Sequence, residues 1–396
     1  MTTHDAEPAR IVFGQPSFGV EEEDLLLSTL RSGWIGQGPL VQQFEQKFAE
    51  YVSDGEDPPF VRAVSSCTAA LHLSLLAAGI GPGDEVITTP FTFVATINAI
   101  EHAGATPVFV DIDPDTLSIT PEAVAAAITP RTRAIMPVHF AGRGLDLAGF
   151  HQLVREHDLW LVEDAAHAVG TITQGRKVGN PVDERTLVCF SFYPNKNLAA
   201  PEGGAIATRN AEVAERIEVL RLHGLNNDAW KRFVVDTYQP NVAIYAGYKY
   251  NWTDLQASVA LPQLAKLEGF LAVREQVAAW YDEALAGIDG IQRFSRPVPS
   301  ADERHALHLY QIRVPRELRH TLLTDLRAQR IGVAVHYESA HRHPFYASRI
   351  GGSFPESDRA SEDLITLPLH VQMTRDDVQR VAAAIARVIA SRPSLV

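Results

Sequence analysis

A lysine lies where the sequence predicts the turn between two buried strands. The run TLVCFSF is almost wholly apolar and GGAIAT follows soon after it, and both patterns are typical of strands covered on both faces. Lys196 falls between them, in the segment YPNKN. Burial lowers the pKa of a lysine amine, so part of its population is a neutral nucleophile that can form a Schiff base with an aldehyde. For one lysine taken alone, an amine that simply reaches the surface is the commoner case.

A second stretch has the pattern of a phosphate-binding turn. Ser65, Ser66, Cys67 and Thr68 precede the apolar helical run AALHLSLLAAG. Small polar residues in this position are typical of a helix N-terminus, whose free N–H groups suit a phosphate. An ordinary helix N-cap is the commoner explanation for such a stretch by itself.

Further candidates follow other predicted strands. Asp164 follows the apolar run LWLV and Glu163, and a buried carboxylate needs a cationic or hydrogen-bonding partner. A structural ion pair and a functional role explain Asp164 equally well. Phe93 begins a helical stretch, where an aromatic side chain either packs in the core or stacks on a flat ring.

Taken together, these residues fit one ligand, pyridoxal phosphate, which has an aldehyde, a pyridine nitrogen, a flat ring and a phosphate. We expect Lys196 to hold the aldehyde, Asp164 to keep the ring nitrogen protonated, and Phe93 to stack on the ring. His167 should lie near the phenolic oxygen, and Ser191 should bind the phosphate together with the turn at Cys67 and Thr68. The predicted set of cofactor contacts is Cys67, Thr68, Phe93, Asp164, His167, Ser191 and Lys196, with Lys196 and Asp164 as catalytic residues.

The elements that must position these residues alternate along the chain. From about residue 60 to 210, apolar runs that predict strands (DEVITT, TPVFVDI, RAIMPVHF, LWLVEDA, TLVCFSF, GGAIAT) are separated by helical patterns. Such alternation predicts an α/β fold with a parallel sheet. Ligands of these folds bind at the carboxyl ends of the strands, where the candidate residues stand.

The pattern changes near residue 254. A long helical stretch, which we expect to bend near Pro262, is followed by the loop SRPVPSADER, a strand (LYQIRV), a helix, a further strand (GVAVHY) and a closing helix. We therefore expect a large cofactor-binding domain over residues 12–253 and a smaller α+β domain over residues 254–396.

Composition excludes several classes of protein. The chain has 35 basic and 48 acidic residues and a net charge of −13, which argues against nucleic acid or an anionic membrane as a partner. The two cysteines form no CxxC pair, so neither a disulfide framework nor a structural metal site is expected. The polar start of the sequence and the lack of an apolar run of about 20 residues predict a cytoplasmic protein.

Four segments together resemble one known family. EDAAHAVG, FSFYPNKNLAAPEGGAIAT, GYKYNWTDLQAS and SGWIGQGP are similar to the DegT/DnrJ/EryC1/StrS nucleotide-sugar aminotransferases, and the resemblance runs from about residue 10 to 390. It implies the fold type I of pyridoxal phosphate-dependent transferases. In this fold a large domain holds a mainly parallel seven-stranded sheet between helices, and a smaller α+β domain follows. It also implies the roles given above for Asp164, Ser191 and Lys196.

The resemblance further implies a homodimer with shared active sites. In the family, a segment matching GYKYNWTD reaches the partner's site and gives the phosphate an asparagine. The commonest family pattern is GYNYR, and Lys249 and Asn251 stand here in place of its Asn and Arg; GYKYN occurs in a branch that includes UDP-4-amino-4-deoxy-L-arabinose aminotransferases. Either side chain is a candidate for the phosphate contact, and we favour Asn251.

Substrate contacts are likewise implied by the resemblance. The loop SGWIGQGP, with Trp34, Ile35 and Gly36, matches a loop over the nucleotide-sugar site of the family, although a surface turn has the same composition. His336 and His341 follow a predicted strand of the small domain, and either a sugar contact or a structural role explains them.

The reaction is inferred from the same segments. A dehydratase branch of the family has histidine at the position of Lys196, so the lysine favours transamination. Glu202-Gly203-Gly204 resembles members that act on 4-keto sugars, whereas Tyr193-Pro194 resembles members that act on 3-keto sugars. We expect an aminotransferase that converts a nucleotide-diphosphate 4-keto sugar to the 4-amino sugar with L-glutamate as donor. The alternatives are a 3-keto-sugar aminotransferase and a regulatory protein that binds pyridoxal phosphate without turnover.

Overall fold

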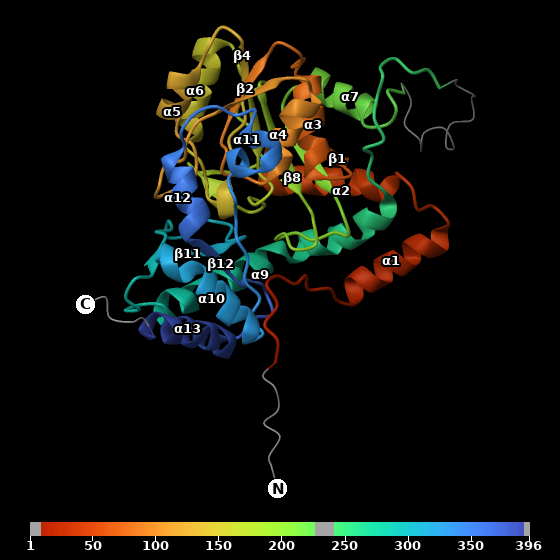
Figure 1. Cartoon of the computed structure of the whole chain (residues 1–396). Helices are drawn as coiled ribbons and strands as arrows, with labels where there is room; N and C mark the ends of the chain where they lie inside the picture. The colour runs from red at the N-terminus through yellow and green to blue at the C-terminus, as the bar shows by residue number, and fades with distance from the viewer. Residues whose placement is uncertain (1–8, 226–240, 392–396) are drawn as a thin grey trace.

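The computed structural model describes residues 9–225 and 241–391 of the chain. Its centre is a seven-stranded sheet with the strand order β1-β9-β8-β5-β4-β2-β3 (Figure 1). Neighbouring strands from β8 to β3 are parallel, whereas β9 is antiparallel to both of its neighbours. The predicted α/β fold with a mainly parallel sheet is therefore confirmed. The strands are β1 (Phe60–Val64), β2 (Glu85–Thr88), β3 (Thr106–Phe109), β4 (Thr132–Ile135), β5 (Trp160–Asp164), β8 (Thr186–Ser191) and β9 (Gly204–Thr208).

Helices cover both faces of this sheet. Side chains alternate along β8, so Leu187 and Cys189 enter the core beneath α3, α4 and α7, while Val188 and Phe190 enter the core beneath α2 and the first half of α9. Helices α5 and α6 pack on the same face as α2, farther along the sheet. The helices before α9 are α1 (Val20–Ser32), α2 (Pro39–Val52), α3 (Cys67–Ala77), α4 (Val94–His102), α5 (Pro121–Ala127), α6 (Leu147–His157) and α7 (Ala211–Leu220), with the short turn η1 (Phe140–Gly142) and the hairpin β6 (Ile172–Thr173) and β7 (Arg176–Lys177).

The long helix α9 (Asp254–Ala284) connects the hydrophobic core beneath α2 with the hydrophobic core of the C-terminal part. Its N-terminus is fixed by a capping box, in which Thr253 and Gln256 satisfy each other's backbone N–H groups. Ala257 and Leu267 pack against the large sheet, whereas Val277 and Tyr281 pack in the core of the C-terminal part. Figure 1 shows the helix running beneath the large sheet toward β11 and β12.

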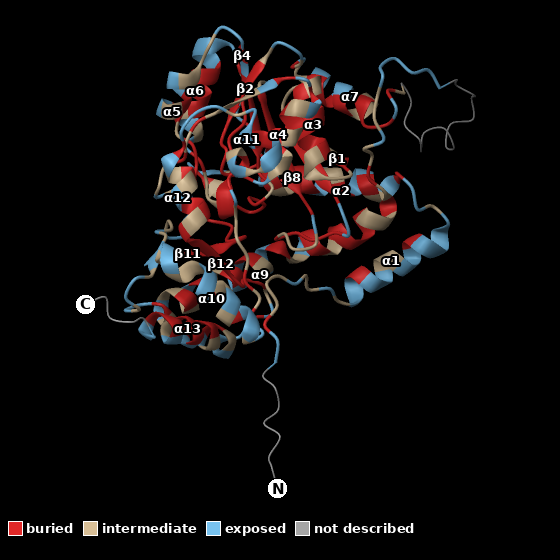
Figure 2. Cartoon of the chain, in the orientation of Figure 1, coloured by how far each residue is buried: buried red, intermediate tan, exposed pale blue. Residues whose placement is uncertain are grey.

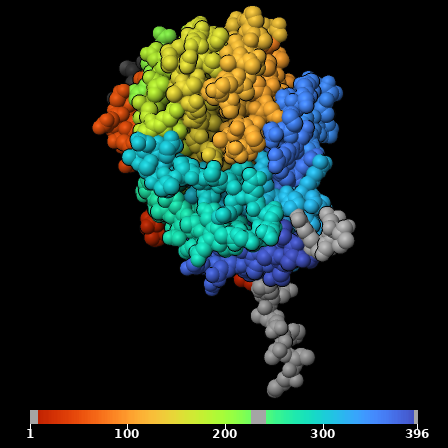
Figure 3. Space-filling view, turned by 90° about the vertical axis from the view of Figure 1, so that its left-hand side faces the viewer, coloured from red at the N-terminus to blue at the C-terminus, as the bar shows by residue number. Residues whose placement is uncertain are grey.

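The C-terminal part is built on a three-stranded antiparallel sheet with the order β10-β11-β12. The space-filling view shows these segments, teal to blue, packed directly against the yellow and orange segments of the large sheet (Figure 3). The division at residue 254 stays a prediction, because α9 belongs to both cores. The remaining elements are β10 (Gln292–Arg293), β11 (Tyr310–Arg313), α10 (Arg316–Ala328), η2 (Ala340–Arg342), α11 (Pro344–Ala347), α12 (Pro355–Asp363), β12 (Leu364–Leu367) and α13 (Arg375–Ala390).

One predicted strand is wrong. The segment GVAVHY forms one isolated bridge, from Ala334 to Thr366, and Ile331 directly before it bridges to Ile11. This stretch pairs for single residues with two different segments, and a Cβ on Gly332 would lie 2.5 Å from the backbone nitrogen of Phe13. The third strand of the small sheet is instead β12.

Burial follows the layers of the fold. Buried residues run through the middle of the sheet, while α1 presents an exposed outer face (Figure 2). Within residues 9–225 and 241–391, no helix combines the length and the apolar character needed to cross a membrane. The polar start of the sequence, residues 1–8, lies outside the described residues.

Candidate active site

The register of the large sheet brings the predicted strand ends together. Val64 at the end of β1 and Ser191 at the end of β8 are both paired with Gly204, the first residue of β9. Asp164 ends β5, where it is paired with Cys189. Because side chains alternate along a strand, Asp164 and Ser191 lie on the face of the sheet that carries α3.

The turn after β1 is packed tightly against β9. Ser66 is the N-cap of α3, and its Oγ accepts a hydrogen bond from the N–H of Ala69. A Cβ on Gly204 would lie 2.7 Å from the backbone nitrogen of Cys67, so only glycine allows this approach. The N-cap explanation is therefore correct for Ser66. The N–H groups of Cys67 and Thr68 belong to the first turn, where a helix has no partner of its own for them.

Asp164 is buried and hydrogen-bonded without an ion pair. Its Oδ2 accepts a bond from Thr96 Oγ1 at 2.7 Å, and its Oδ1 accepts one from the N–H of Ala166 at 3.1 Å. Thr96 in turn shares a bond with Thr92 at 2.9 Å. Burial raises the pKa of the Asp164 carboxyl above its usual range. The structure thus holds this carboxylate in place from α4 while leaving it without a cationic partner among the described residues.

Lys196 lies at the same end of the sheet. Its Nζ is 3.3 Å from Nε2 of His308, which lies two residues before the start of β11. Burial lowers the pKa of the amine to about 8, although the nearby Cys67 and Asp164 act in the opposite direction. The amine is therefore partly neutral near physiological pH, as its position after a buried strand predicted.

His167 connects this site to the C-terminal part. Its Nδ1 accepts a hydrogen bond from the N–H of Ala141, and its Nε2 is 3.1 Å from the hydroxyl of Tyr337. Its ring lies 4.4 Å from the ring of His308, centroid to centroid. Burial lowers the pKa of both histidines well below the usual value, so both rings are neutral.

Phe93 does not pack in the core. It is the N-cap residue of α4, its side chain is 59% exposed, and its ring lies 6.0 Å from that of Tyr337. The core-packing explanation is therefore wrong, and the ring is open to a ligand.

The predicted substrate residues are dispersed. The loop with Trp34, Ile35 and Gly36 joins α1 to α2, and the carbonyl of Gly36 accepts a bond from the N–H of Asp254. Ile35 is exposed.

The two small-domain histidines differ. His336 bonds to Thr366 and stacks on Phe13, and burial with the nearby Lys196 lowers its pKa to about 4. His341 is bonded to Asp358 of α12 at 3.0 Å. The structure thus brings His336 to the neighbourhood of Lys196 and directs His341 to α12.

The segment GYKYN lies alongside the predicted phosphate-binding turn of its own chain. Asn251 forms an isolated bridge with Val64, and the N–H of Ser65 donates to the carbonyl of Tyr250. The side-chain amide of Asn251 donates to the carbonyl of Trp252. Lys249 is exposed and bridges to Leu222.

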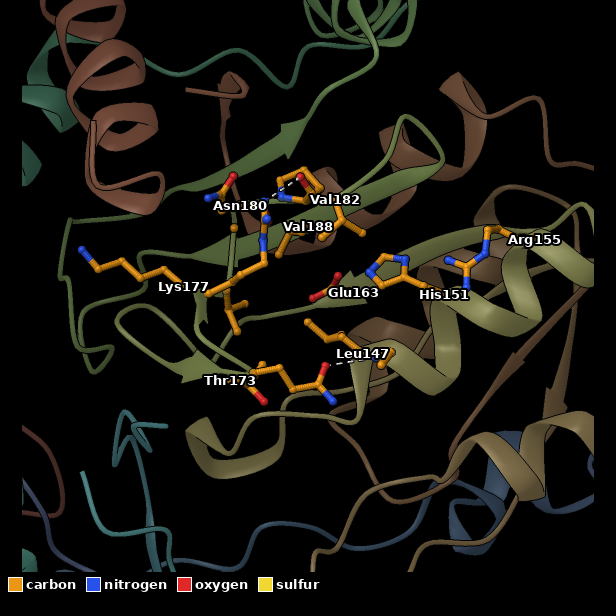
Figure 4. A pocket seen from close by; sticks show the side chains of 15 residues that line it. Leu147, His151, Arg155, Glu163, Thr173, Lys177, Asn180, Val182 and Val188 are labelled. Atoms are coloured by element: carbon orange, nitrogen blue, oxygen red, sulfur yellow. Dashed lines mark hydrogen bonds between the residues drawn. The ribbon is translucent and has the colours of Figure 1, made fainter. Parts of the chain in front are cut away.

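A cavity of about 270 Å³ lies elsewhere, on the opposite face of the sheet between α6 and the β6–β7 hairpin. Figure 4 shows the side chains of Glu163 and His151 pointing into it. None of the predicted site residues lines this cavity. Within the described ranges, no group of three or more His, Cys, Asp or Glu side chains could hold a metal ion.

Sequence reasoning missed several residues at the site. Thr96, His308 and Tyr337 contact the predicted residues directly. A usable signal existed for Thr96, which lies on the helix that Phe93 begins. No pattern singled out His308 or Tyr337, because their contacts arise only when the C-terminal part packs on the large sheet.

The fold and this set of residues define a pyridoxal phosphate-dependent enzyme of fold type I. More specifically, the chain belongs to the DegT/DnrJ/EryC1/StrS aminotransferase family, whose model matches residues 16–386. The resemblance seen in the four sequence segments is therefore confirmed.

Curated and solved relatives cover nearly the whole chain. The spore coat polysaccharide biosynthesis protein SpsC of Bacillus subtilis (strain 168) is 42% identical over 390 residues, which are 95% of this chain and 96% of SpsC. The crystal structure of DesV from S. venezuelae in complex with a ketimine intermediate is similar, with 34% identity, a TM-score of 0.84 and coverage of 95% of each chain.

A third relative was solved in a cofactor-bound state. The PLP form of the putative sugar aminotransferase Spr1654 from Streptococcus pneumoniae is 29% identical, with a TM-score of 0.86 and coverage of 96% of this chain and 99% of Spr1654. The same protein was also solved in a PMP form, with a TM-score of 0.87.

Proposed function

We propose that this sugar aminotransferase converts a nucleotide-linked 4-keto sugar to the corresponding 4-amino sugar, with L-glutamate as amino donor. The observation that carries the proposal is the pair formed by Lys196 and Asp164. A partly neutral amine and a buried carboxylate lie at the same end of the sheet, and no ion pair of the described residues joins them. Transamination needs both groups free for a cofactor.

The residues present fit pyridoxal phosphate. Asp164 is held by Thr96 and Ala166 but has no cationic partner in the described part of the chain, and a protonated ring nitrogen would supply one. Phe93 offers an exposed ring next to Tyr337. Ser191 and the first turn of α3 present donors for a phosphate on either side of Gly204.

When bound, pyridoxal phosphate supplies an aldehyde for covalent attachment and a ring that withdraws electrons from the substrate. Lys196 is the proposed point of attachment, and its amine, once released, moves the proton at the donor's Cα as general base and general acid. Asp164 would hold negative charge opposite the ring nitrogen and keep that nitrogen protonated. His167 stays neutral and is oriented by Ala141 and Tyr337.

The position of the keto group is inferred from sequence resemblance. Glu202-Gly203-Gly204 resembles members that act on 4-keto sugars, but both glycines also have packing reasons. A Cβ on Gly203 would lie 2.7 Å from the indole nitrogen of Trp252, and Gly204 touches the turn at Cys67. Tyr193 and Pro194 favour a 3-keto sugar, which is therefore the second candidate.

A second copy of the chain is the proposed partner. Val20, Leu27 and Leu30 leave an exposed apolar surface on α1, and such surfaces are commonly buried in assemblies. Asn251 is the proposed contact to the partner's phosphate. Within its own chain Asn251 lies beside Val64, so a contact to the phosphate of its own chain's site is the alternative.

Mixing two variants separates these locations. Lys196→Ala and Asn251→Ala protomers should each be weak alone. If Asn251 serves the partner, their heterodimer has one site with both defects and one intact site, so activity partly returns. No recovery, despite demonstrated subunit exchange and a clear defect in each parent, would place Asn251 in its own chain's site or in none.

Two measurements test the function itself. Incubation with L-glutamate alone should change the spectrum of the bound cofactor to that of its aminated form, and an unchanged spectrum would favour the regulatory alternative. Turnover should then be measured on a panel of UDP-, dTDP- and GDP-linked sugars with the keto group at position 4 or 3. Preference for the 3-keto sugars would overturn the proposed regiochemistry.

A further inference from the structure

His308 is the hydrogen-bonding partner of the Lys196 amine, and its position is fixed from two sides. We propose that His308 is a positioning residue that holds the Lys196 amine at the strand ends and away from Asp164; this rests on the proposed role of Lys196. Among residues 9–225 and 241–391, His308 is the one side chain that hydrogen-bonds Nζ of Lys196, at 3.3 Å.

The chemistry of the contact follows from charge. A lysine ammonium only donates hydrogen bonds, so Nε2 of His308 accepts and the proton of the neutral ring resides on Nδ1. That Nδ1 is buried and has no partner among the described residues. Among the described residues, the contact with Lys196 is therefore the one hydrogen bond that the ring of His308 makes.

The surroundings keep the ring neutral. Burial lowers the pKa of His308, and Lys196, His167, Arg274 and His336 lower it further. A neutral partner leaves the amine with its pKa near 8. An ion pair between Lys196 and Asp164 would raise the pKa of the amine and use up the carboxylate that the cofactor ring requires.

The backbone around His308 is held by the large sheet and by α9. The N–H of His308 donates to the carbonyl of Ala141 at 3.0 Å, in a turn where Ala141 has the left-handed φ of 60°. From the other side, Arg274 of α9 donates to the carbonyl of Leu307 at 3.1 Å. Arg274 is buried and makes no ion pair among the described residues, so its guanidinium is committed to backbone carbonyls such as this one.

The test uses two substitutions with different hydrogen-bonding ability. His308→Phe keeps a ring against His167 but removes the acceptor, whereas His308→Gln keeps an acceptor near the place of Nε2. Each substitution is made in two backgrounds, one with native Lys196 and one with Lys196→Ala. His370→Leu is the control, because His370 is also buried, lies in the C-terminal part and has an unpartnered ring nitrogen. Thermal melting shows which variants fold.

The primary measurement is the affinity of each protein for pyridoxal phosphate by equilibrium dialysis. With Lys196 present, His308→Phe should weaken binding about tenfold, while His308→Gln and His370→Leu should stay within about threefold. In the Lys196→Ala background, His308→Phe should change affinity by less than about twofold, because the partner is already absent. Borohydride reduction with peptide mapping should show less cofactor fixed to Lys196 in His308→Phe.

Three outcomes would overturn the proposal. Equal losses in both backgrounds would show that His308 contacts the cofactor or supports the fold. No loss with Lys196 present would show that the amine needs no such partner. If His308→Phe does not fold, loss of affinity in the folded His308→Gln variant equal to that of Lys196→Ala would contradict a role as acceptor. These readouts use no sugar, so failure of the proposed substrate would leave them unchanged.

Discussion

Glu163 and Asp164 are neighbours on β5 and are both buried, yet they serve opposite faces of the sheet. Glu163 is 2% exposed and its Oε2 lies 2.8 Å from Nε2 of His139. Asp164 is 6% exposed, and within the described part of the chain its carboxylate is bonded only to an uncharged hydroxyl and a backbone N–H. The cavity of about 270 Å³ lies on the side of Glu163, whereas Lys196 lies on the side of Asp164.

The difference shows which property marks the site. Glu163 has a charged or polar partner within its own chain, which is what a stable buried carboxylate requires. Among the described residues, Asp164 has hydrogen-bond donors but no ionisable partner, and it stands near a lysine with a lowered pKa. Perturbed groups left available for a ligand identify the site better than the size of a cavity does.

The largest expected effect distinguishes the lysines of the two faces. Lys196→Ala should lower turnover by at least about 10³-fold, because it removes the covalent anchor and the proton carrier together. Lys177→Ala is the matched control, since Lys177 lines the cavity but bonds to Asp54 and to the carbonyl of Tyr51. It should change turnover by less than about twofold. Steady-state kinetics on both proteins checks this. Comparable losses of turnover in the two variants would contradict the assignment of Lys196, and not Lys177, to the active site.

Substitution of the two neighbouring carboxylates should affect different properties, turnover for Asp164 and stability for Glu163. Asp164→Asn should lower turnover by about 10²- to 10³-fold by removing the charge opposite the ring nitrogen. The pKa of the Asp164 carboxyl is raised in the folded protein, so its charged form lowers stability at neutral pH. The Asp164→Asn variant should therefore melt no lower than the native protein.

Glu163→Ala should instead lower the free energy of unfolding by about 1–3 kcal/mol, since His139 loses its buried partner. Its turnover per folded molecule should stay within about fivefold of native. Denaturant melts together with kinetics separate the pair. A stable but inactive Glu163→Ala protein would contradict the comparison.

Packing at the strand ends provides a third test. Gly204→Ala should cost about 1–3 kcal/mol and weaken cofactor binding, because its Cβ would lie 2.7 Å from the backbone of Cys67. Gly269→Ala, in the middle of α9, meets no atom within 4 Å and should be neutral or stabilise by up to about 1 kcal/mol. Urea denaturation measures both, and equal behaviour of the two variants would refute the close approach at the site.

The smallest expected effect is the pH dependence caused by Lys196. The folded pKa of about 8 lies below the unfolded value, so the charged amine destabilises the cofactor-free fold at pH 7. Between pH 8 and about 10.4 the unfolded chain binds more protons, and stability should rise with pH. Lys196→Met should therefore be more stable at pH 7 by about 1–2 kcal/mol, a value reduced by partial exposure, and the difference should shrink above pH 8. If the free energy of unfolding depended on pH in the same way for both proteins, the predicted cost of burying the charged Lys196 amine would be excluded.

The sequence predicted the residues that depend on single strands. Lys196, Asp164 and Ser191 follow apolar runs, and the ends of parallel strands meet at one edge, so their convergence followed from the pattern. The contacts of His308 and Tyr337 were not predictable, because they depend on how the C-terminal part packs on the sheet. The wrong strand at GVAVHY has a similar cause, since its backbone meets the segment around Phe13 and β12 at single residues.

The most direct measurement is borohydride reduction of the purified enzyme with its cofactor, followed by peptide mapping of the lysines. The account predicts that the cofactor label is found on Lys196, within the segment YPNKN, and not on Lys177 beside the cavity. A label on any other lysine, or a stoichiometric cofactor that leaves Lys196 unlabelled, would contradict the assignment of the active site.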